Sequence, residues 1–538
     1  MKLEDYNISK DLLEFSPQND DLHDQKLNTK PVSYMKDAFN RFRKNKASIV
    51  ASIIIIILVL FAIVVPFISK YQVKVPVADN YPSYKFALPK NGLSTALGIP
   101  FWDGCKEQSL GYSDYVKYQA IEQETGTKII VGDVTVREEK GIGGKIRTFY
   151  DFREDSYFKD GVEYYTITPE RYFAIQEYQN KTGIQVIYPM MDLTKNGRLT
   201  DPNLIAFQTD ANLWYEFTRK NGVNTPVYDA DGNLKNIYLK YKTVQTTDEN
   251  GNVVERPYDN YNSLRVEENG EKLYSYAEVK DGAYKVRLLK YNYYKFYHSE
   301  ILKDGVKEPY FVFGSNEIGQ DLLVCLSSGA RFSLILAVIV ASVNLFVGAI
   351  IGAIEGYYGG VVDLVIERFI EILGSIPFMI VITLLKYHIS GSQILLLFIA
   401  FFLTGWTGMA GRTRMQFYRF KNQEYVMAAR TLGASDKRIM FKHIFPNAIG
   451  TLITSCVLVI PGVIFSETSL SYLGIINLET GNMTSVGTLL SQGNAHLFTY
   501  PHVILFPSIF ISLLMLSFNL FGNGLRDAFN PSLRGTEE

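Results

Sequence analysis

The sequence predicts an all-α polytopic membrane protein with six transmembrane helices and an inserted α+β domain outside the membrane. Apolar runs that carry almost no charge, and are long enough to cross a bilayer, occur near the N-terminus and again after residue 331. A charged, tyrosine-rich block from Lys70 to Phe313 separates them, and its short β-branched runs alternate with turn signals. The hydrophobic fraction of 47% over 538 residues is therefore an average of two unlike materials.

Composition and motifs argue against several classes of function. A net charge of −1 gives no indication of a nucleic-acid partner. The block Lys70–Phe313 contains one histidine and one cysteine, so a His-based zinc site or a Cys-His nucleophile within it is not expected. Its adjacent acids Glu138 and Glu139 fit a solvated face better than a catalytic pair. The sequence contains no G-x-x-x-x-G-K-[ST] motif, so we expect no nucleotide site. The scarcity of histidine and cysteine adds the expectation of no cofactor, no metal and no enzymatic activity.

The first apolar run, Ala47–Ser69, has 23 residues without a charge, and about 20 are enough to span the hydrocarbon core. A secretory signal peptide is the alternative interpretation. The run starts too late for one, is too long and lacks an Ala-x-Ala cleavage site. We therefore predict transmembrane helix 1 at residues 47–69. The basic stretch Lys36–Lys46 makes residues 1–46 a cytoplasmic segment by the positive-inside bias.

Residues 70–313 are predicted to form an extracytoplasmic α+β domain with several hairpins. Its turn signals are Asp231-Gly232, Asn250-Gly251, Asp281-Gly282 and Asp304-Gly305. A weak internal repeat relates YQAIEQETGTKIIV, which begins at Tyr118, to IQEYQNKTGIQVIY, which begins at Ile175. Each copy is typical of a helix, a Thr-Gly turn and a strand. Duplication is one explanation, and two ordinary helix-to-strand passages are the other.

Residues 314–522 are predicted to form the remaining membrane part, followed by a tail at 523–538. The five further helices are expected at residues 332–354, 363–385, 387–411, 448–473 and 503–521. Gly374 and Pro377 favour a kink in the second of these helices.

A polar hairpin at residues 424–447, EYVMAARTLGASDKRIMFKHIFPN, lies between two of the apolar runs. Gly433 permits a turn, and Ser435 with Asp436 can cap a second helix. Pro446 is expected to end that helix, because the residue before a proline avoids the α region. A lip of small residues held by membrane helices is suited to docking into a groove of another protein.

Two independent arguments give the orientation in the membrane. Eight Lys and Arg residues at 412–442 oppose two acids, so the loop 412–447 is expected to face the cytoplasm. Counting six crossings from a cytoplasmic N-terminus also places this loop and the tail inside. The same count places residues 70–331 outside.

The hairpin resembles the EAA loop of ABC-importer permeases and is most similar to the oligopeptide and dipeptide permeases. Ala428 and Ala429 are followed after three residues by Gly433, as in that loop, and HIFP ends at Pro446. Met427 stands where the family usually has the glutamate of E-A-A. The small residues that give the docking shape are retained, whereas a contact made by that glutamate is not supported.

Three further stretches carry the resemblance. A pattern G-T-D-x-x-G-R-D…G-A-R-x-S-L is common in C-type permeases, and this chain departs from it at Asn316 and Gln320. It matches at Gly314, Gly319, Asp321, Gly329, Ala330, Arg331, Ser333 and Leu334. Glu467 lies in ETSLSYLG, which is similar to E-x-x-L-S-F/Y-L-G of the family. The C-terminal stretch matches at Gly524, Leu525, Arg526, Asp527, Asn530 and Pro531.

Four acidic residues in the membrane part are candidate functional residues. Asp363, Glu367 and Glu371 are four apart and share one helical face. Because charges within a bilayer are costly, they lie either in water-exposed cytoplasmic turns or along the translocation pathway. Glu467 is a second candidate for the pathway, and a structural partner for the backbone or a neighbouring helix is the favoured alternative.

The resemblance implies the permease fold of a type I ABC importer and a coupling loop that contacts a separate ATPase. Its implied coupling residues are Glu424, Met427, Ala428, Ala429, Arg430, Gly433, Ala434 and Ser435. Implied partners are a second permease subunit, two ATPases that bind the ATP, an extracytoplasmic peptide-binding lipoprotein and a peptide substrate, in a bacterial plasma membrane. Dipeptides, nickel or another small solute are alternative substrates. A secondary transporter and a membrane-anchored receptor are alternative classes. The domain at 70–313 lies outside the resemblance.

Overall fold

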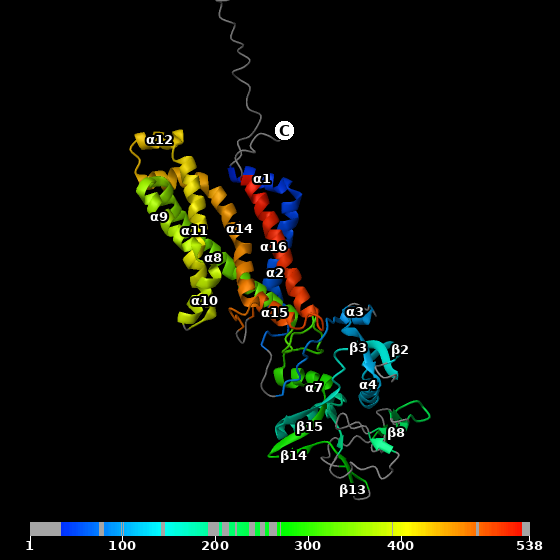
Figure 1. Cartoon of the computed structure of the whole chain (residues 1–538). Coiled ribbons are helices and arrows are strands. Elements are labelled where there is room, and N and C mark those ends of the chain that lie inside the picture. The colour runs from blue at the N-terminus through cyan, green and yellow to red at the C-terminus, as the bar shows by residue number, and fades with distance from the viewer. Residues whose placement is uncertain are drawn as a thin grey trace, which may run out of the picture.

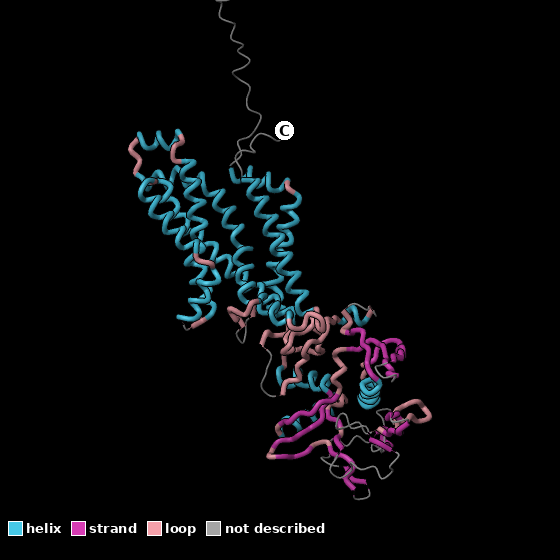
Figure 2. Tube along the Cα trace, in the orientation of Figure 1, coloured by secondary structure: helices cyan, strands magenta, loops and turns pink. Residues whose placement is uncertain are grey.

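The computed structural model describes the chain from residue 34 to residue 529 with internal gaps. The gaps are residues 75–79, 98, 100–101, 141–145, 192–203, 207–214, 221–222, 236–242, 248–252, 258–265, 269–270, 390 and 480–483. Figure 1 shows a helical bundle at one end and a second domain at the other, and Figure 2 shows that the described strands gather in that second domain. The turn predicted at Asn250-Gly251, and Asn530 and Pro531 of the C-terminal stretch, lie outside the described residues.

The bundle has five to six membrane-spanning helices, as the sequence predicts. Among the described residues, five helices are each long and apolar enough to cross: α2 (Lys46–Ile68), α8 (Leu322–Tyr358), α11 (Gln393–Phe420), α14 (Phe445–Tyr472) together with the turns before it, and α16 (His502–Phe529). The sixth is a pair, α9 (Gly360–Ser375) and α10 (Phe378–His388), bent by 78°. The bend falls at Pro377, because proline pushes the preceding Ile376 out of the α region to ψ 118°. The short helices α1 (Tyr34–Lys44) and α15 (Val486–Asn494) flank the bundle.

The helices are longer than the apolar runs that predict them. α8 begins at Leu322 and not at residue 332, and α11 ends at Phe420 and not at Gly411. A hydropathic run marks only the part of a helix that lies in hydrocarbon, whereas the backbone hydrogen bonds continue into polar turns. Asp321 sets the start of α8, because its carboxylate accepts a hydrogen bond from the Leu323 amide at 2.9 Å.

The expectation that Pro446 ends the helix after the hairpin is wrong. A short α13 (Asp436–Arg438) leads into a π-helical turn at Ile439–Ile444, and α14 follows from Phe445 without a break. Pro446 stands in the first turn of α14, where a missing N–H is tolerated. The wider π turn before it changes the hydrogen-bond register, so that the proline ring does not have to face an α-helical carbonyl.

The inserted domain begins with two units of the same design. The first unit is β1 (Cys105–Gly111), α4 (Tyr112–Thr125), β2 (Ile130–Lys140) and β3 (Ile146–Asp155), with β3 between β1 and β2. The second unit is β4 (Val162–Ile167), α5 (Pro169–Thr182), β5 (Ile187–Tyr188) and β15 (Ala283–Leu289), with β15 antiparallel to both β4 and β5. Each unit is therefore a strand, a helix and two further strands, and the last strand pairs with the other two.

The remaining strands form small sheets after β5. They are β6 (Met190–Met191), β7 (Leu204–Ala206), β8 (Glu216–Lys220), β9 (Val223–Pro226), β10 (Thr243–Thr247), β11 (Val253–Pro257), β12 (Val266–Glu268), β13 (Glu271–Ser275) and β14 (Glu278–Lys280). The turn predicted at Asp281-Gly282 joins β14 to β15, and both of its residues have positive φ, as this tight hairpin requires.

The two units share local hydrogen bonds at a constant spacing of 57 residues. Glu122 in α4 accepts from the Ile129 and Ile130 amides at 2.6 and 2.7 Å. Gln179 in α5, 57 residues later, accepts from the amides of residues 186 and 187 at 2.6 and 2.7 Å. Gly126 and Gly183, again 57 residues apart, both end their helices in the left-handed conformation. This agreement favours duplication over two unrelated helix-to-strand passages.

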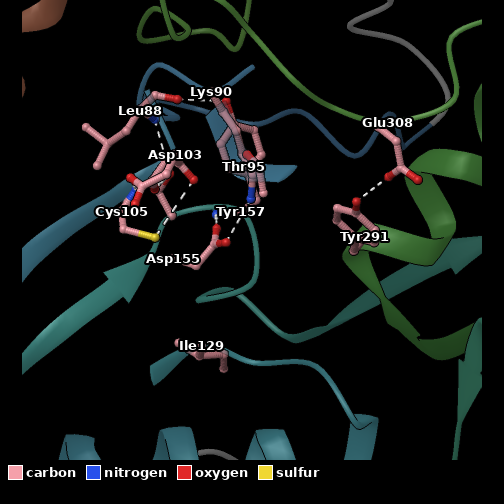
Figure 3. A network of polar contacts seen from close by, with 12 residues as sticks. Leu88, Lys90, Thr95, Asp103, Cys105, Ile129, Asp155, Tyr157, Tyr291 and Glu308 are labelled. Carbon is pink, nitrogen blue, oxygen red and sulfur yellow. Dashed lines mark hydrogen bonds and ion pairs between the residues drawn. The ribbon is translucent and has the colours of Figure 1, made fainter. Parts of the chain in front are cut away.

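The core of the domain is built from tyrosines and buried ion pairs. Lys90 and Asp155 are both buried and lie 2.8 Å apart between the Lys90 Nζ and a carboxylate oxygen. Figure 3 shows this pair beside Tyr157, whose hydroxyl donates to the Leu88 carbonyl at 2.7 Å. Burial raises the pKa of Asp155, and the neighbouring Lys90 opposes that shift. The domain thus has a hydrophobic core of its own, as globular domains have.

Aromatic contacts fix the domain to the bundle. Phe86 stacks on Tyr500, which precedes α16, with 4.4 Å between ring centroids. Trp102 stacks on Phe506 of α16 at 6.2 Å. On the other side, the Lys70 ammonium after α2 donates to the Gly305 carbonyl at 3.0 Å. The domain therefore rests on the N-terminal end of α16 and on the segment that follows α2.

Candidate coupling surface

The candidate surface is the hairpin at the end of the bundle opposite the domain (Figure 1). Its first helix, α12 (Glu424–Thr431), ends before Gly433, which has φ +77° and would meet no atom within 4 Å if it carried a Cβ. Glycine adopts this left-handed conformation without strain, so the chain can turn here into α13. The sequence places small residues where the chain must turn in open space.

Most of the sequence-predicted coupling residues are exposed on this hairpin. The exposed members are Glu424, Met427, Ala428, Arg430, Gly433 and Ser435, and the half-buried members are Ala429 and Ala434. Met427 is 52% exposed and Leu432 is 87% exposed. Exposed apolar side chains beside alanines give a surface that another protein can cover.

One face of the hairpin is anchored in the bundle. Val426 is fully buried and packs in a cluster with Tyr357 of α8, Phe417 of α11 and Ile439 of the π turn. Ala434 packs against the same cluster. The exposed and buried faces of α12 are therefore distinct, and the buried face packs against α8 and α11.

Polar contacts tie the hairpin to the end of α8. The Tyr357 hydroxyl donates to the Asp436 carboxylate at 2.6 Å. The Arg430 guanidinium lies 5.8 Å from the centre of the Tyr357 ring. The Lys421 ammonium donates to the Gly356 carbonyl at 3.0 Å. These contacts join the hairpin and the C-terminal end of α8 into one packed unit.

An arginine gathers three carboxylates next to this unit. Arg414 of α11 pairs with Asp363 of α9 through two bonds of 2.6 and 2.9 Å. It also lies 3.2 Å from Glu355 of α8, which is fully buried, and 3.6 Å from Glu367 of α9. The Tyr418 hydroxyl donates to Asp363 at 2.6 Å. Arg414 thereby joins α8, α9 and α11 near the coupling hairpin.

The acids that the sequence singles out have different surroundings. Asp363 and Glu367 lie together at Arg414, whereas Glu371 is exposed and pairs with Arg368 one turn away. Glu467 in α14 is fully buried and accepts a hydrogen bond from the Ser333 hydroxyl of α8 at 2.7 Å. This geometry favours the structural alternative for Glu467, because its carboxylate links two helices.

Sequence reasoning missed Glu355 and Arg414 as a pair. Glu355 and Arg414 lie just past the ends of the apolar runs 332–354 and 387–411, so neither run marked them as charges that need a partner. The identity of the partner depends on which helices pack side by side, and that arrangement is not written in either helix alone.

Together, the spanning helices and the anchored hairpin define a multi-pass membrane protein that exposes a small, partly apolar hairpin at one end. Residues 344–535 match the family described as binding-protein-dependent transport system inner membrane component. Residues 33–89 match the N-terminal TM domain of oligopeptide transport permease C. The inserted domain lies almost entirely between these two matches.

Relatives agree with these matches. The oligopeptide transport system permease protein OppC of Bacillus subtilis is 40% identical over 222 residues, which are 41% of this chain and 72% of that protein. OppC of Haemophilus influenzae is 41% identical over 227 residues, 42% of this chain and 72% of that protein. The dipeptide transport system permease protein DppC of Lactococcus lactis is 40% identical over 222 residues, 41% of this chain and 64% of that protein.

The chain belongs to the OppC/DppC-type permease family of binding-protein-dependent ABC importers. It is a multi-pass inner membrane subunit of the kind that does not bind nucleotide. Membership implies that an ATPase and a substrate-binding protein are partners in general terms.

Proposed function

We propose that this chain forms half of the translocation pathway of an ATP-driven importer for oligopeptides. The observation that carries the proposal is the exposed hairpin around Gly433, which is tied to α8 through Tyr357 and Asp436. An ATPase that closes on nucleotide would pull α12, and the pull would reach α8 and α11 through their shared cluster. The membrane helices would then alternate access between the two sides.

The proposed assembly contains a second permease subunit, so that the two form a heterodimer, and two ABC ATPase subunits that bind the ATP. An extracytoplasmic peptide-binding lipoprotein would deliver the peptide. The proposed coupling residues are those of the hairpin from Glu424 to Ser435, and Glu367, Glu371 and Glu467 remain candidates for the pathway. Dipeptides, nickel or another small solute are the alternative substrates. Uptake of labelled dipeptides, tetrapeptides and longer peptides would separate these alternatives.

The proposed orientation has both termini in the cytoplasm and residues 70–331 outside a bacterial plasma membrane. Two facts support it. The loop 412–447 carries the Lys and Arg excess that is typical of cytoplasmic loops, and the inserted domain lies at the opposite end of the bundle (Figure 1). Labelling of cysteines introduced at Ser435 and in the domain, in intact cells, tests it. Reaction of a cysteine at position 435 with an impermeant reagent would show that the orientation is the opposite of the proposed one.

The coupling proposal is tested by giving Gly433 a bulky side chain. In Gly433→Leu, the side chain adds bulk to the docking face and strains a residue at φ +77°. We expect the ATPase to be lost on copurification in detergent and peptide uptake to fall at least about tenfold, which is about 1.4 kcal/mol of binding.

The matched control is Gly474→Leu at the other end of α14. Gly474 has φ +70° and open space around it, so the backbone strain is similar but the position is far from the hairpin. Normal ATPase retention in Gly474→Leu and loss in Gly433→Leu support coupling at the hairpin. Full uptake by Gly433→Leu, or uptake without any ATPase, would contradict the proposal and favour a secondary transporter.

The inserted domain is proposed to dock the binding protein or to guide peptide toward the pathway. Its two ends lie close together, since the Tyr71 hydroxyl donates to the Glu308 carbonyl at 2.8 Å. Residues 75–305 can therefore be removed and the ends rejoined by a short linker. Unchanged peptide uptake and unchanged affinity for the binding protein in this deletion would contradict both proposed roles of the domain. If the chain were a membrane-anchored receptor, the full-length protein would show no peptide uptake, and the deletion would abolish its signalling.

A further inference from the structure

One loop of the inserted domain carries no charge and displays apolar side chains. The stretch from Asn91 to Trp102, NGLSTALGIPFW, lacks any charged residue, although Lys90 and Asp103 flank it directly. Within it, α3 (Gly92–Ala96) and the residues that follow expose Leu93 at 73%, Leu97 at 65% and Ile99 at 45%. Single exposed leucines are ordinary, but three within seven residues of an uncharged loop are a patch.

The base of this loop is rigid. The Asn91 amide donates to the Trp102 carbonyl at 3.0 Å, and the Asn91 side chain caps α3 by accepting from the Ser94 amide at 2.7 Å. Lys90, just before the loop, is buried in the ion pair with Asp155 (Figure 3). The apolar tip is therefore held in place by a closed and buried base.

The loop lies at the level where a membrane helix ends. Trp102 stacks on Phe506, and Phe506 stacks on Phe313 at 4.2 Å. Phe506 is the fifth residue of α16, so it lies roughly 6 Å along the axis from the first residue, His502, at 1.5 Å per residue. Figure 1 shows α3 beside this end of α16, at the side of the bundle.

The neighbouring surface of α16 is itself apolar and uncovered. Leu505 and Ile509 are 51% and 46% exposed on the helix that Trp102 contacts. In a spanning helix such side chains face lipid. The loop and this part of α16 therefore both expose apolar side chains close to the contact between Trp102 and Phe506.

We propose that Leu93, Leu97 and Ile99 insert into the interface of the lipid bilayer beside α16. The ligand is the lipid surface itself. A short amphipathic segment that carries leucines and an adjacent tryptophan is typical of chains that rest about 5–10 Å deep at the boundary of headgroups and acyl chains. This contact fixes the orientation of the inserted domain relative to the membrane. It does not depend on the proposed substrate or on the side of the membrane that the domain faces.

The test places a fluorophore on the full-length chain in lipid nanodiscs. Leu97→Cys is labelled in a background with Cys105→Ser and Cys456→Ser, while the buried Cys325 is kept. The matched control is Val279→Cys, because Val279 is 55% exposed on β14, which Figure 1 shows at the far end of the domain. Lipids with a quencher near the headgroup should quench position 97 at least about twofold more than position 279, and aqueous iodide should do the reverse.

A label-free measurement guards against insertion by the probe. Hydroxyl-radical footprinting of the unlabelled chain should protect Leu93 and Leu97 in nanodiscs and leave Val279 reactive. Equal iodide quenching at positions 97 and 279, with strong oxidation of Leu93, would overturn the proposal. Shielding of position 97 that requires an added protein subunit would also overturn it, since the patch would then be a protein interface.

Discussion

The bundle and the inserted domain solve packing in opposite ways. In the bundle, α8 approaches α11 through glycines: a Cβ on Gly348 would lie 2.7 Å from the Trp406 carbonyl oxygen, and one on Gly352 would overlap the Ala410 carbonyl. In the domain, the largest fully buried side chains are mostly tyrosines, among them Tyr157. Lipid gives no hydrophobic drive between helices, so contact comes from close backbone approach. In a domain surrounded by water, the burial of large aromatic side chains contributes much of the stability.

The same contrast holds for buried charge. In the domain, Arg287 of the second unit forms a bidentate pair with Glu124 of the first, and both side chains are 6% exposed. In the bundle, Arg414 holds three carboxylates where three helices meet. The pair in the domain joins two units of one fold, whereas the cluster in the bundle joins helices that are proposed to move. Removing small residues should therefore harm the bundle most, and removing a buried charge should harm the domain most.

The largest effect is expected from Arg287→Ala. It leaves Glu124 buried without its partner, which typically costs about 3–5 kcal/mol. Pulse proteolysis of the domain in urea, on the full chain in detergent, measures the loss. The control Arg137→Ala removes an exposed pair with Asp151 and should have little effect. Equal stability of Arg287→Ala and wild type would show that the pair does not hold the two units together.

The next effect tests the bundle through Gly352→Ala. The added methyl would overlap the Ala410 backbone, which cannot move without displacing α11. We expect a loss of about 1–3 kcal/mol, seen as a lower melting temperature in detergent and less protein in the membrane. Gly408→Ala is the control, because a Cβ there meets nothing within 4 Å. If the two variants behave alike, close approach is not what holds α8 to α11.

The two regions also differ in what the sequence could reveal. The membrane helices follow from uncharged apolar runs, because hydrocarbon permits little else. Their ends do not follow, since α8 starts ten residues before its apolar run, at Leu322. Gly433 and its small neighbours mark the turn of the hairpin at residues 424–447 from local chemistry alone. The prediction at Pro446 failed because a π turn at Ile439–Ile444 precedes α14, and the proline then lies in the first turn of that helix.

Contacts between distant segments were beyond the reach of the sequence. Tyr357 and Asp436 meet only because α8 ends beside the hairpin, and neither residue type is unusual where it stands. In the domain, the Thr-Gly turns after α4 and α5 indicate the repeat, since both lie within short local segments. The partner of β5 is β15, which follows only after the nine described strands β6 to β14, so local patterns could not identify it.

The repeat itself predicts matched effects in the two units. Gln179→Ala removes an acceptor shared by two backbone amides and should cost about 1–3 kcal/mol, because those buried donors lose their partner. Glu122→Ala should cost a similar amount for the same reason. Glu177→Ala, on the exposed face of α5, is the control. Pulse proteolysis measures all three, and a large loss in only one unit would show that the shared pattern does not carry equal weight.

The smallest expected effect concerns pH at the seam between domain and bundle. Burial lowers the pKa of His298 from its ordinary 6.5, although Asp304 at 2.8 Å from Nδ1 opposes the shift. Its Nε2 lies 3.0 Å from the Tyr81 hydroxyl. The unfolded chain therefore binds a proton more readily than the folded domain does, and stability should fall as the pH drops below about 6.5.

The comparison is the urea midpoint of the full chain at pH 8 and at pH 5.5, in wild type and in His298→Asn. The variant should have a shallower decline on acidification, because asparagine does not titrate, whatever its stability at pH 8. Other charged groups near this pocket are Lys70, Lys74 and Asp321, and they are common to both proteins, so the difference in slope reports on His298. If the urea midpoint of the wild type instead rose on acidification by more than that of the variant, the attraction to Asp304 would outweigh the effect of burial on the pKa of His298. Charge attraction would then dominate at the seam, as it does in the Arg414 cluster of the bundle, whereas burial dominates in the tyrosine core of the domain.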